Sequence, residues 1–222
     1  MLCVIIPTLN AQMHLEFILR DLGDVPRIVI ADGGSEDKTL DIAARYQTVT
    51  ALGATGRGQQ LALGANWAGE ADWYLFLHAD SRLHPKAMEK IAHHMAHYGD
   101  QAGYFDFKLD SSKLSARFLE KLVALRCFAL AMPYGDQGLL IPQSLYASIG
   151  GYDEITLFED VGIIRRLGRR RLRRLGVSIF TCARRYYKEG YFRRAFKNIG
   201  LMIRYYRGAD PEALAKIYYK GK

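Results

Sequence analysis

Short apolar runs alternate with helix-like stretches through the first 100 residues, and this alternation limits the chain to few folds. The apolar runs have the length of buried strands and cover residues 2–6, 26–31, 48–52 and 73–77. The stretches between and after them are typical of helices and cover residues 11–22, 37–46, 57–68 and 85–97. Strands that alternate with helices form βαβ units with a parallel sheet. The sequence therefore predicts an α/β fold with a mostly parallel sheet flanked by helices.

Small or acidic residues stand where three of these strands end. Asn10 follows the first apolar run, Asp32 follows the second, and Asp80 lies just beyond the fourth. The carboxyl ends of parallel strands share one edge of the sheet, where ligands of open α/β folds bind. A carboxylate at this edge can hold Mg²⁺ or Mn²⁺ that also coordinates a diphosphate. We expect a nucleotide and a divalent ion there, with Asp80 as ligand; a turn or N-cap aspartate is the alternative.

The pattern changes after residue 100. A strand is expected at 102–109, followed by a long helix at 113–131 and a short strand at 139–141. An amphipathic stretch occupies residues 161–170, and further helices are expected at 190–207 and 211–219. We divide the chain into an α/β domain, residues 1–175, and a basic, aromatic, helical extension, residues 176–222, packed on the same domain.

Composition is that of a globular protein. Half of the 222 residues are hydrophobic and 24% are charged. No apolar stretch approaches the length of a membrane span. No basic region precedes the first apolar run, which argues against a signal peptide. Cys3, Cys127 and Cys182 are isolated and odd in number, which favours a reducing cytoplasm.

Positive charge is concentrated in the C-terminal part. The net charge is +8, and from residue 165 onwards Lys and Arg outnumber Asp and Glu, whereas the preceding part is slightly acidic. The arginine-rich block 165–174 suits a phosphate clamp, a membrane-surface patch or a nucleic-acid patch, or simply a solvated face. In residues 184–187 and 191–194, aromatic side chains alternate with cations, which is typical of membrane interfaces and of single-stranded nucleic-acid sites.

Other residues have chemistry that the sequence leaves open. Arg57, between two glycines at a predicted helix start, offers a guanidinium and nearby backbone amides to phosphate, or is a solvated loop residue. Glu159 and Asp160 form a carboxylate pair that suits a general base or merely supplies negative charge at a helix N-terminus. His78 is a ribose contact, a metal ligand or a core histidine. Asp136 shapes an acceptor pocket or makes a turn.

Five motifs in a fixed order resemble the family 2 glycosyltransferases with a GT-A, Rossmann-like fold. They span roughly residues 1–170 and read Pro7-Thr8-Leu9-Asn10, Asp32-Gly33-Gly34-Ser35, Gly56-Arg57-Gly58, His78-Ala79-Asp80-Ser81 and Phe158-Glu159-Asp160. The C-terminal extension resembles the small subgroup described as radical-SAM/selenodomain-associated transferases. The resemblance implies a hexosyltransferase type of enzyme that is inverting and metal-assisted. Such an enzyme moves a sugar from a nucleotide-sugar donor to a hydroxyl acceptor.

The resemblance also implies roles for single residues. Those implied to contact the nucleotide-sugar are Pro7, Asn10, Asp32, Arg57 and His78, the last standing where the family has the first acid of its Asp-x-Asp motif. Asp80 corresponds to the last acid of that motif and would hold Mg²⁺ or Mn²⁺. Asp160 corresponds to the general base, with Glu159 beside it, and Arg184 or Arg185 would help to neutralise phosphate.

Two other hypotheses remain open at this stage. A nucleotidyltransferase would use the same strand-edge metal but take a nucleoside triphosphate. A non-catalytic protein would use its basic tail to bind lipid or nucleic acid. For the transferase we expect a cytoplasmic location, peripheral at the inner face of an anionic membrane, and an acceptor class that includes lipid-linked alcohols. Nucleic acid is not an expected partner of the transferase.

Overall fold

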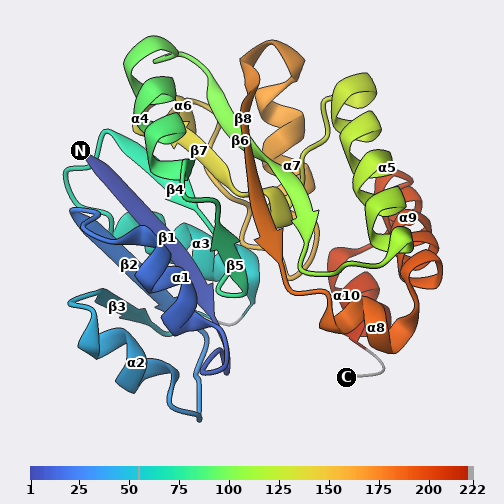
Figure 1. Cartoon of the computed structure of the whole chain (residues 1–222), viewed down its shortest axis with the longest axis horizontal. Helices are drawn as coiled ribbons and strands as arrows, with labels where there is room; N and C mark the ends of the chain where they lie inside the picture. Colours follow the sequence, from blue (N-terminus) through green and yellow to red (C-terminus); the bar gives the residue numbers. More distant parts are fainter. Residues whose placement is uncertain (55, 220–222) are drawn as a thin grey trace.

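One mixed sheet runs through the computed structural model, which describes residues 1–54 and 56–219 and the side chains of all of these except 185, 188, 189, 192 and 219. The strand order is β3-β2-β1-β4-β7-β6-β8-β5 (Figure 1). The strands are β1 (Leu2–Thr8), β2 (Arg27–Asp32), β3 (Val49–Leu52), β4 (Trp73–Phe76), β5 (Ser81–Leu83), β6 (Ala102–Leu109), β7 (Leu139–Pro142) and β8 (Leu172–Thr181). The pairs β3–β2, β2–β1, β1–β4 and β6–β8 are parallel, which confirms the expected α/β fold with a mostly parallel sheet.

Helices cover both faces of this sheet and form two hydrophobic cores. One core is packed under α1 (Leu15–Leu22), α2 (Thr39–Arg45) and α4 (Ala87–His97). The other is packed under α3 (Arg57–Asn66), α6 (Gln143–Ser148) and α7 (Glu159–Leu167). Successive side chains of a strand point to opposite faces. Apolar residues therefore fill β1 without a break, because both of its faces are buried.

Parallel pairing brings the predicted site edge together. Thr8 at the end of β1 pairs with Asp32 at the end of β2, and Ile5 pairs with Phe76 at the end of β4. The loops that follow these three strands therefore leave the sheet at the same edge. This placement confirms the expected topology of the N-terminal half and positions the polar residues described below.

The loops after β1 and β2 differ from the sequence prediction. The first helix begins at Leu15 rather than residue 11, because the backbone N–H groups of Asn10, Ala11 and Gln12 donate to side chains of residues 35–39. The next helix, α2, begins at Thr39 rather than residue 37, and the Ser35 hydroxyl before it donates to Asp32. Side chains of the loop after β2 thus accept hydrogen bonds from backbone N–H groups of the loop after β1.

The arginine-rich block 165–174 contributes to secondary structure and ion pairs. It covers the end of α7, a 3₁₀ turn η2 (Arg169–Arg171) and the start of β8. Arg166 pairs with Asp153 and Arg174 with Asp106, while Arg169 donates to backbone carbonyls at the end of α5 (Leu114–Leu130). Most of the block is therefore engaged within the fold. The sequence prediction missed β8, β5 and α6.

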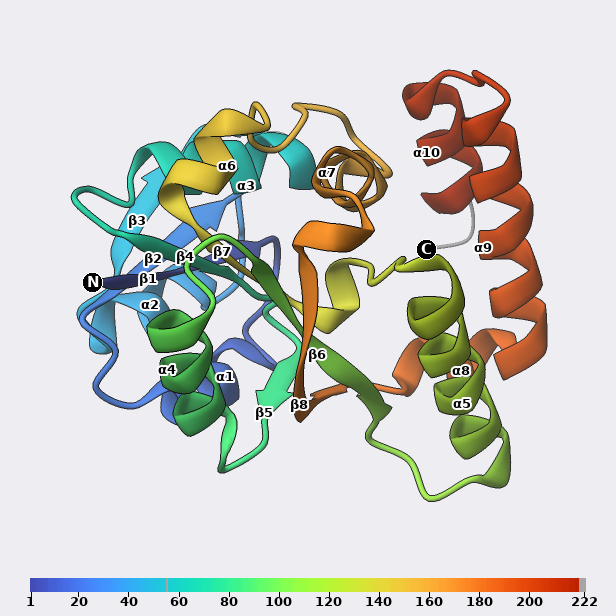
Figure 2. The same ribbon diagram turned by 90° about the horizontal axis from the view of Figure 1, so that it is seen from above.

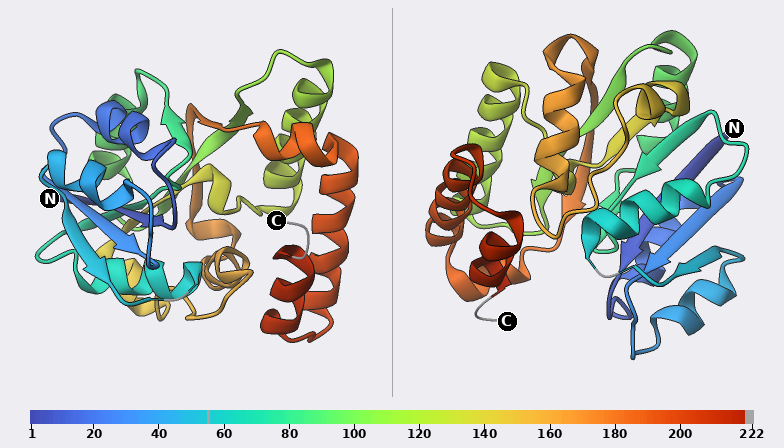
Figure 3. Two further views of the ribbon diagram at one scale, coloured as in Figure 1. Left: turned by 90° about the horizontal axis from the view of Figure 1, so that it is seen from below. Right: turned by 180° about the vertical axis from the view of Figure 1, so that it is seen from behind.

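The C-terminal helices α8 (Arg184–Glu189), α9 (Tyr191–Tyr206) and α10 (Pro211–Tyr219) gather with α5 at the end of the molecule opposite β3 (Figures 2 and 3). Leu201 of α9 and Leu214 of α10 pack on Leu157, just before α7. The proposed boundary between residues 175 and 176 falls within β8, and the domain division itself stays a prediction. Among the described residues, no helix is both long and apolar enough to span a membrane.

Candidate active site

The Asp32 carboxylate organises the turn after β2. It is fully buried and accepts hydrogen bonds from the hydroxyls of Thr8 (2.7 Å) and Ser35 (2.6 Å) and from the backbone N–H groups of Gly34 (2.9 Å) and Ser35 (2.7 Å). Burial acts to raise the pKa of Asp32, but these hydrogen bonds outweigh it and lower the pKa. All four donors come from the protein, so a contact of Asp32 with the nucleotide stays a prediction.

Asn10 joins the loops after β1 and β2. Its backbone lies in the left-handed region (φ 50°), its N–H donates to Ser35 Oγ, and its Oδ1 accepts a hydrogen bond from the Glu36 N–H. Gln60 reinforces the same edge from α3 by donating to the carbonyls of Thr8 and Ala31 at 2.6 and 2.9 Å. Exposed Asn10 thus stands on a braced loop pair, and half-buried Pro7 lies near the end of β1; their contact with a nucleotide stays a prediction.

Arg57 binds the carboxylate pair at the start of α7. Its Nε donates to Oε1 of Glu159, and its terminal nitrogen lies 3.7 Å from Oδ2 of Asp160. Burial opposes the positive charge, but both carboxylates hold the pKa of Arg57 above its ordinary value. The expected open helix start is not observed, because residues 153–156 lie against Gly56 and Gly58. The sequence did not show that Arg57 and the carboxylate pair meet.

The two carboxylates differ in environment. The Glu159 side chain is fully buried, and its Oε2 has no hydrogen-bond partner within the described ranges. Burial raises the pKa of Glu159, although the Arg57 guanidinium opposes this shift. Asp160 is 14% exposed and is held by N–H groups of Gly135 and Val161, both at 2.8 Å. Asp160, not Glu159, is therefore the carboxylate that a substrate can reach.

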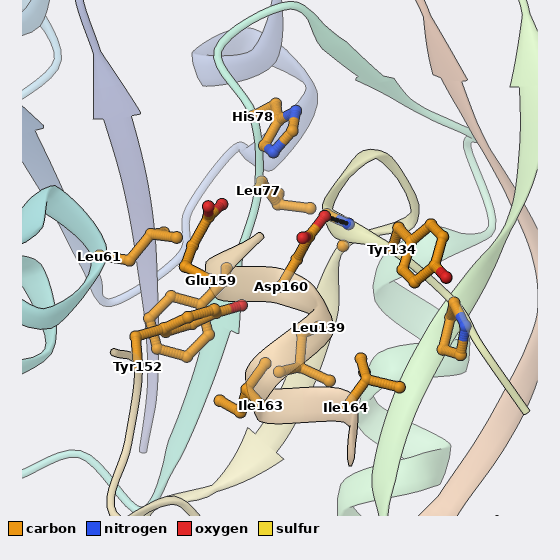
Figure 4. A pocket seen from close by; sticks show the side chains of 14 residues that line it. Leu61, Leu77, His78, Tyr134, Leu139, Tyr152, Glu159, Asp160, Ile163 and Ile164 are labelled. Carbon is orange, nitrogen blue, oxygen red and sulfur yellow. Dashed lines mark hydrogen bonds between the residues drawn. The ribbon is translucent and has the colours of Figure 1, made fainter. Parts of the chain in front are cut away.

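Asp160 and His78 meet at one pocket (Figure 4). A Cβ added to Gly135 would lie 3.0 Å from Nε2 of His78 and 3.2 Å from Oδ2 of Asp160. Glycine at the start of η1 (Gly135–Gln137) therefore lets both side chains approach the backbone. The pocket floor is apolar and includes Leu139 and Ile163. A polar rim over an apolar floor suits the two sides of a sugar ring.

Asp136, next to Gly135, is a half-buried residue within the 3₁₀ turn η1. Its Oδ1 is buried and has no hydrogen-bond partner in the described part of the chain. Burial raises the pKa of Asp136, opposed by the charge of Arg126 and reinforced by that of Asp160. Asp136 thus makes a turn beside the pocket of Asp160 but is not among the residues that line it. A role in shaping an acceptor pocket stays a prediction.

Asp80 lies apart from this pocket, in the turn between β4 and β5. Its half-buried carboxylate makes no hydrogen bond or ion pair with any other described residue. No group of three His, Cys, Asp or Glu side chains suited to a metal occurs within residues 1–54 and 56–219. A single unengaged carboxylate nevertheless fits Mg²⁺ or Mn²⁺ whose other ligands are phosphate oxygens and water.

The register of β5 and β8 brings the two phosphate-related predictions together. Ser81 pairs antiparallel with Thr181, so the chain leaves β8 beside Asp80. Exposed Arg184 starts α8 three residues later. The side chain of Arg185 lies outside the described residues. A cation on this segment is thus close in the fold to the predicted metal ligand.

Two tyrosines line the pocket without having been predicted. Tyr152 is buried among the aromatic rings of β4 and α6, and Tyr134 stacks under the guanidinium of Arg126, 4.1 Å from the ring centroid. Each adjoins a glycine, Gly151 or Gly135, at a turn. An aromatic residue beside a glycine turn is a weak signal in sequence alone, because such pairs also occur in ordinary loops.

Known structures share this architecture. S. aureus TarS 1–349 in complex with UDP-GlcNAc has a TM-score of 0.64 and 17% identity, covering 82% of this chain and 58% of that one. Glucosyl-3-phosphoglycerate synthase from Mycobacterium tuberculosis, with Mn²⁺, UDP and glucosyl-3-phosphoglycerate, has a TM-score of 0.57 and 20% identity, covering 79% and 70%. The chain spans 36% of the longer TarS structure. These likenesses show the fold.

Sequence comparison identifies the family. No curated protein matches the chain. The model of glycosyl transferase family 2 matches residues 3–134, more than half of the chain, including the strand-end residues, Arg57, His78 and Asp80. This match favours the glycosyltransferase hypothesis over the nucleotidyltransferase and the non-catalytic binding protein. The chain therefore belongs to glycosyl transferase family 2, and its fold is that of the GT-A transferases.

Proposed function

We propose that the protein transfers a hexose from a nucleotide-sugar to a hydroxyl acceptor with inversion at the anomeric carbon. The observation that carries this proposal is the position of Asp160. Its carboxylate stands at the start of α7, reaches the pocket beside His78, and is fixed by two backbone N–H groups. A general base must be held within reach of the hydroxyl it deprotonates.

The donor nucleotide is proposed to lie over the carboxyl ends of β1 and β2. Pro7 lies near the end of β1, Asn10 stands on the braced loop that follows, and Asp32 holds the neighbouring turn. Ligands of open α/β sheets bind at this edge. Uridine is the first base to test, since the similar structures contain UDP, UDP-GlcNAc or UDP-glucose. Arg57 and His78 then lie between nucleotide and acceptor.

Asp80 is proposed to hold Mg²⁺ or Mn²⁺ together with the donor diphosphate. When bound, the ion would stabilise the negative charge that develops on the departing nucleoside diphosphate. Arg184, and in the same segment Arg185, would add positive charge to that side. His78 occupies the place of a family acid, which leaves Asp80 as the carboxylate available to the ion.

The transfer step follows from this arrangement. Asp160 accepts the proton of the acceptor hydroxyl, whose oxygen attacks the anomeric carbon from the face opposite the leaving group. The new glycosidic C–O bond forms while the bond from that carbon to the diphosphate oxygen breaks, and the nucleoside diphosphate departs. Glu159 is buried beneath the pocket, so its proposed role is to hold Arg57 and thereby position Asp160.

The finer assignments belong to the same proposal. Membership of the radical-SAM/selenodomain-associated subgroup is part of this proposal and rests on the sequence resemblance of the extension alone. A cytoplasmic location suits the three free thiols, of which Cys3 and Cys127 are buried. The acceptor class includes lipid-linked alcohols, in line with the basic aromatic C-terminal helices.

Asp160→Asn and Asp80→Asn test the proposal, with exposed Asp24→Asn as the matched control. Donor binding is measured by calorimetry with UDP-sugars, with and without Mn²⁺, and transfer by UDP release with simple alcohols and a total lipid extract as acceptors. Asp160→Asn should bind donor normally but lose about 10²–10⁴-fold in turnover. Asp80→Asn should lose the Mn²⁺-dependent part of the affinity. Wild-type turnover in Asp160→Asn would refute the assignment of the base.

A further inference from the structure

Helix α5 presents an apolar face to solvent. Its buried side packs on β6 through Leu119 and Val123. Its opposite side carries five large apolar residues that are 44–86% exposed and recur at helical spacing: Leu114, Phe118, Leu122, Leu125 and Phe128. A surface helix of a globular protein normally exposes its polar side. The exposed side of α5 is therefore unusual.

Helix α9 extends this surface. It lies beside α5 at the end of the molecule (Figures 2 and 3), and the two share a hydrophobic cluster that includes Tyr191 and Cys127. Its exposed side carries Phe196, Ile199, Ile203 and Tyr206. We call these four residues and the five of α5 the α5–α9 face. Large apolar surfaces on soluble proteins mark contacts with other proteins or with membranes.

The charged side chains of α5 and α9 indicate which class of partner suits the α5–α9 face. Helix α9 contains no acidic residue, and the only acid of α5, Glu120, is buried against Lys108 and Arg117. Among the described side chains, the exposed charges on the two helices and on the residues directly before and after them are cations: Lys113, Lys121, Arg193, Arg204 and Arg207. The exposed acids Asp110 and Asp210 lie further from the helix ends. A second copy of the same face would bring cations against cations, which is unfavourable. Anionic lipid head groups would instead neutralise them, while the aromatic and aliphatic side chains enter the interface.

A second cavity lies between this surface and the pocket of Asp160. It is lined by Leu130 at the end of α5 and by Tyr206 of α9. It shares Tyr134 and Ile164 with the pocket of Asp160. Arg165, stacked on Tyr206, lies at the same cavity. The pocket of Asp160 is therefore separated from the surface formed by α5 and α9 by residues that both cavities share.

We propose that the α5–α9 face docks on an anionic membrane surface and that the acceptor reaches the site from that side. The second part rests on the proposed transferase function; the docking itself does not. The arginine block and the basic tail as a whole were the sequence-based candidates for this contact. The structure assigns it to two neighbouring helices, because much of the arginine block is engaged inside the fold.

Leu125→Glu tests the docking surface, with Leu52→Glu as the control. The two leucines are 59% and 61% exposed, and Leu52 lies on β3 at the other end of the molecule. Binding is measured by flotation with phosphatidylcholine vesicles containing phosphatidylglycerol, at two salt concentrations. Wild type and Leu52→Glu should bind. Leu125→Glu should bind at least about tenfold more weakly, since the leucine side chain that the membrane would bury is lost. Lys121→Glu should weaken binding mainly at low salt.

Three results would overturn this inference. The first is vesicle binding by Leu125→Glu at the wild-type level, and the second is no vesicle binding by the wild type. The third is a concentration-dependent dimer, seen by sedimentation velocity, that Leu125→Glu abolishes, since a second copy would then be the occupant. UDP-sugar binding measured on the same samples keeps the two proposals apart. Its absence beside intact vesicle binding would refute the transferase proposal alone.

Discussion

The ion pair between Arg57 and Glu159 joins the starts of α3 and α7 across 102 positions of sequence, and its removal has a calculable cost. Arg57→Met keeps most of the alkyl volume but takes away the donor to Oε1 of Glu159. Breaking a buried ion pair from one side costs about 3–5 kcal/mol, because it leaves a buried charge without compensation. Arg57 is 31% exposed, so solvent screens part of its interaction with Glu159. We expect a loss of about 3 kcal/mol in the free energy of unfolding at pH 8.

The cost should depend on pH in a defined direction. Burial already raises the pKa of Glu159, and removal of Arg57 should raise this pKa further. A carboxyl whose pKa is higher in the folded than in the unfolded state binds more protons when folded. Stability therefore falls as pH rises from the unfolded to the folded pKa. The cost of Arg57→Met should thus be smallest near about pH 4.5 and largest above the raised pKa.

Urea unfolding at pH 5 and pH 8 measures both effects. The set is wild type, Arg57→Met, Glu159→Gln and the double variant, which should recover most of the loss and give a coupling energy of about 2 kcal/mol. Arg20→Met removes an exposed pair with Glu16, and its effect on stability should be much smaller than that of Arg57→Met. A cost below about 1 kcal/mol for Arg57→Met, or one equal at both pH values, would refute the reasoning.

Three further changes give expected outcomes. Gly58→Ala should cost about 2–3 kcal/mol, seen as a lower Tm, because the new methyl group would overlap the carbonyl oxygens of Asp153 and Ile155; an unchanged Tm would contradict this packing. Asp136→Asn should gain stability relative to wild type as pH rises from 4 to 7, because burial raises the pKa of Asp136; urea unfolding that shows a constant difference would argue otherwise. Asp32→Asn should cost about 1–3 kcal/mol near neutral pH. This cost should shrink in acid, because the pKa of Asp32 is lowered and its contribution is lost as pH falls through that value; an equal cost in acid would speak against the carboxylate's role.

Most of the fold was predictable because strands that are buried on both faces are continuous apolar runs in the sequence. The apolar runs of β1, β2 and β4 need no partner to be recognised. Strand β8 was missed because arginines occupy its first residues, and only the alternation of Leu175, Val177 and Ile179 indicates a strand. That signal is short and directly follows the arginine-rich block, in which no strand was expected.

Most residues of the candidate site were predictable from the sequence, but the contacts between these residues were not. Asp160 and His78 were named from local motifs, and the structure brings them to one pocket. Residue spacing along the chain could not show that Arg57 would bind Glu159, since that contact depends on how α3 and α7 pack across the sheet. Nor could it show that Asp32 would accept four hydrogen bonds from its own loop and from Thr8.

The place of β8 between β6 and β5 has a consequence for synthesis of the chain on the ribosome. Strands β1 to β4 follow one another closely and can pair soon after they emerge. Strand β6 ends at Leu109, whereas its parallel partner begins at Leu172. Because translation proceeds at roughly 5–20 residues per second, the edge of β6 that pairs with β8 stays unpaired for about 3 to 12 seconds. During this interval β6 exposes an unpaired edge to other nascent chains. The need for chaperones should therefore depend on how fast the last third of the protein is synthesised.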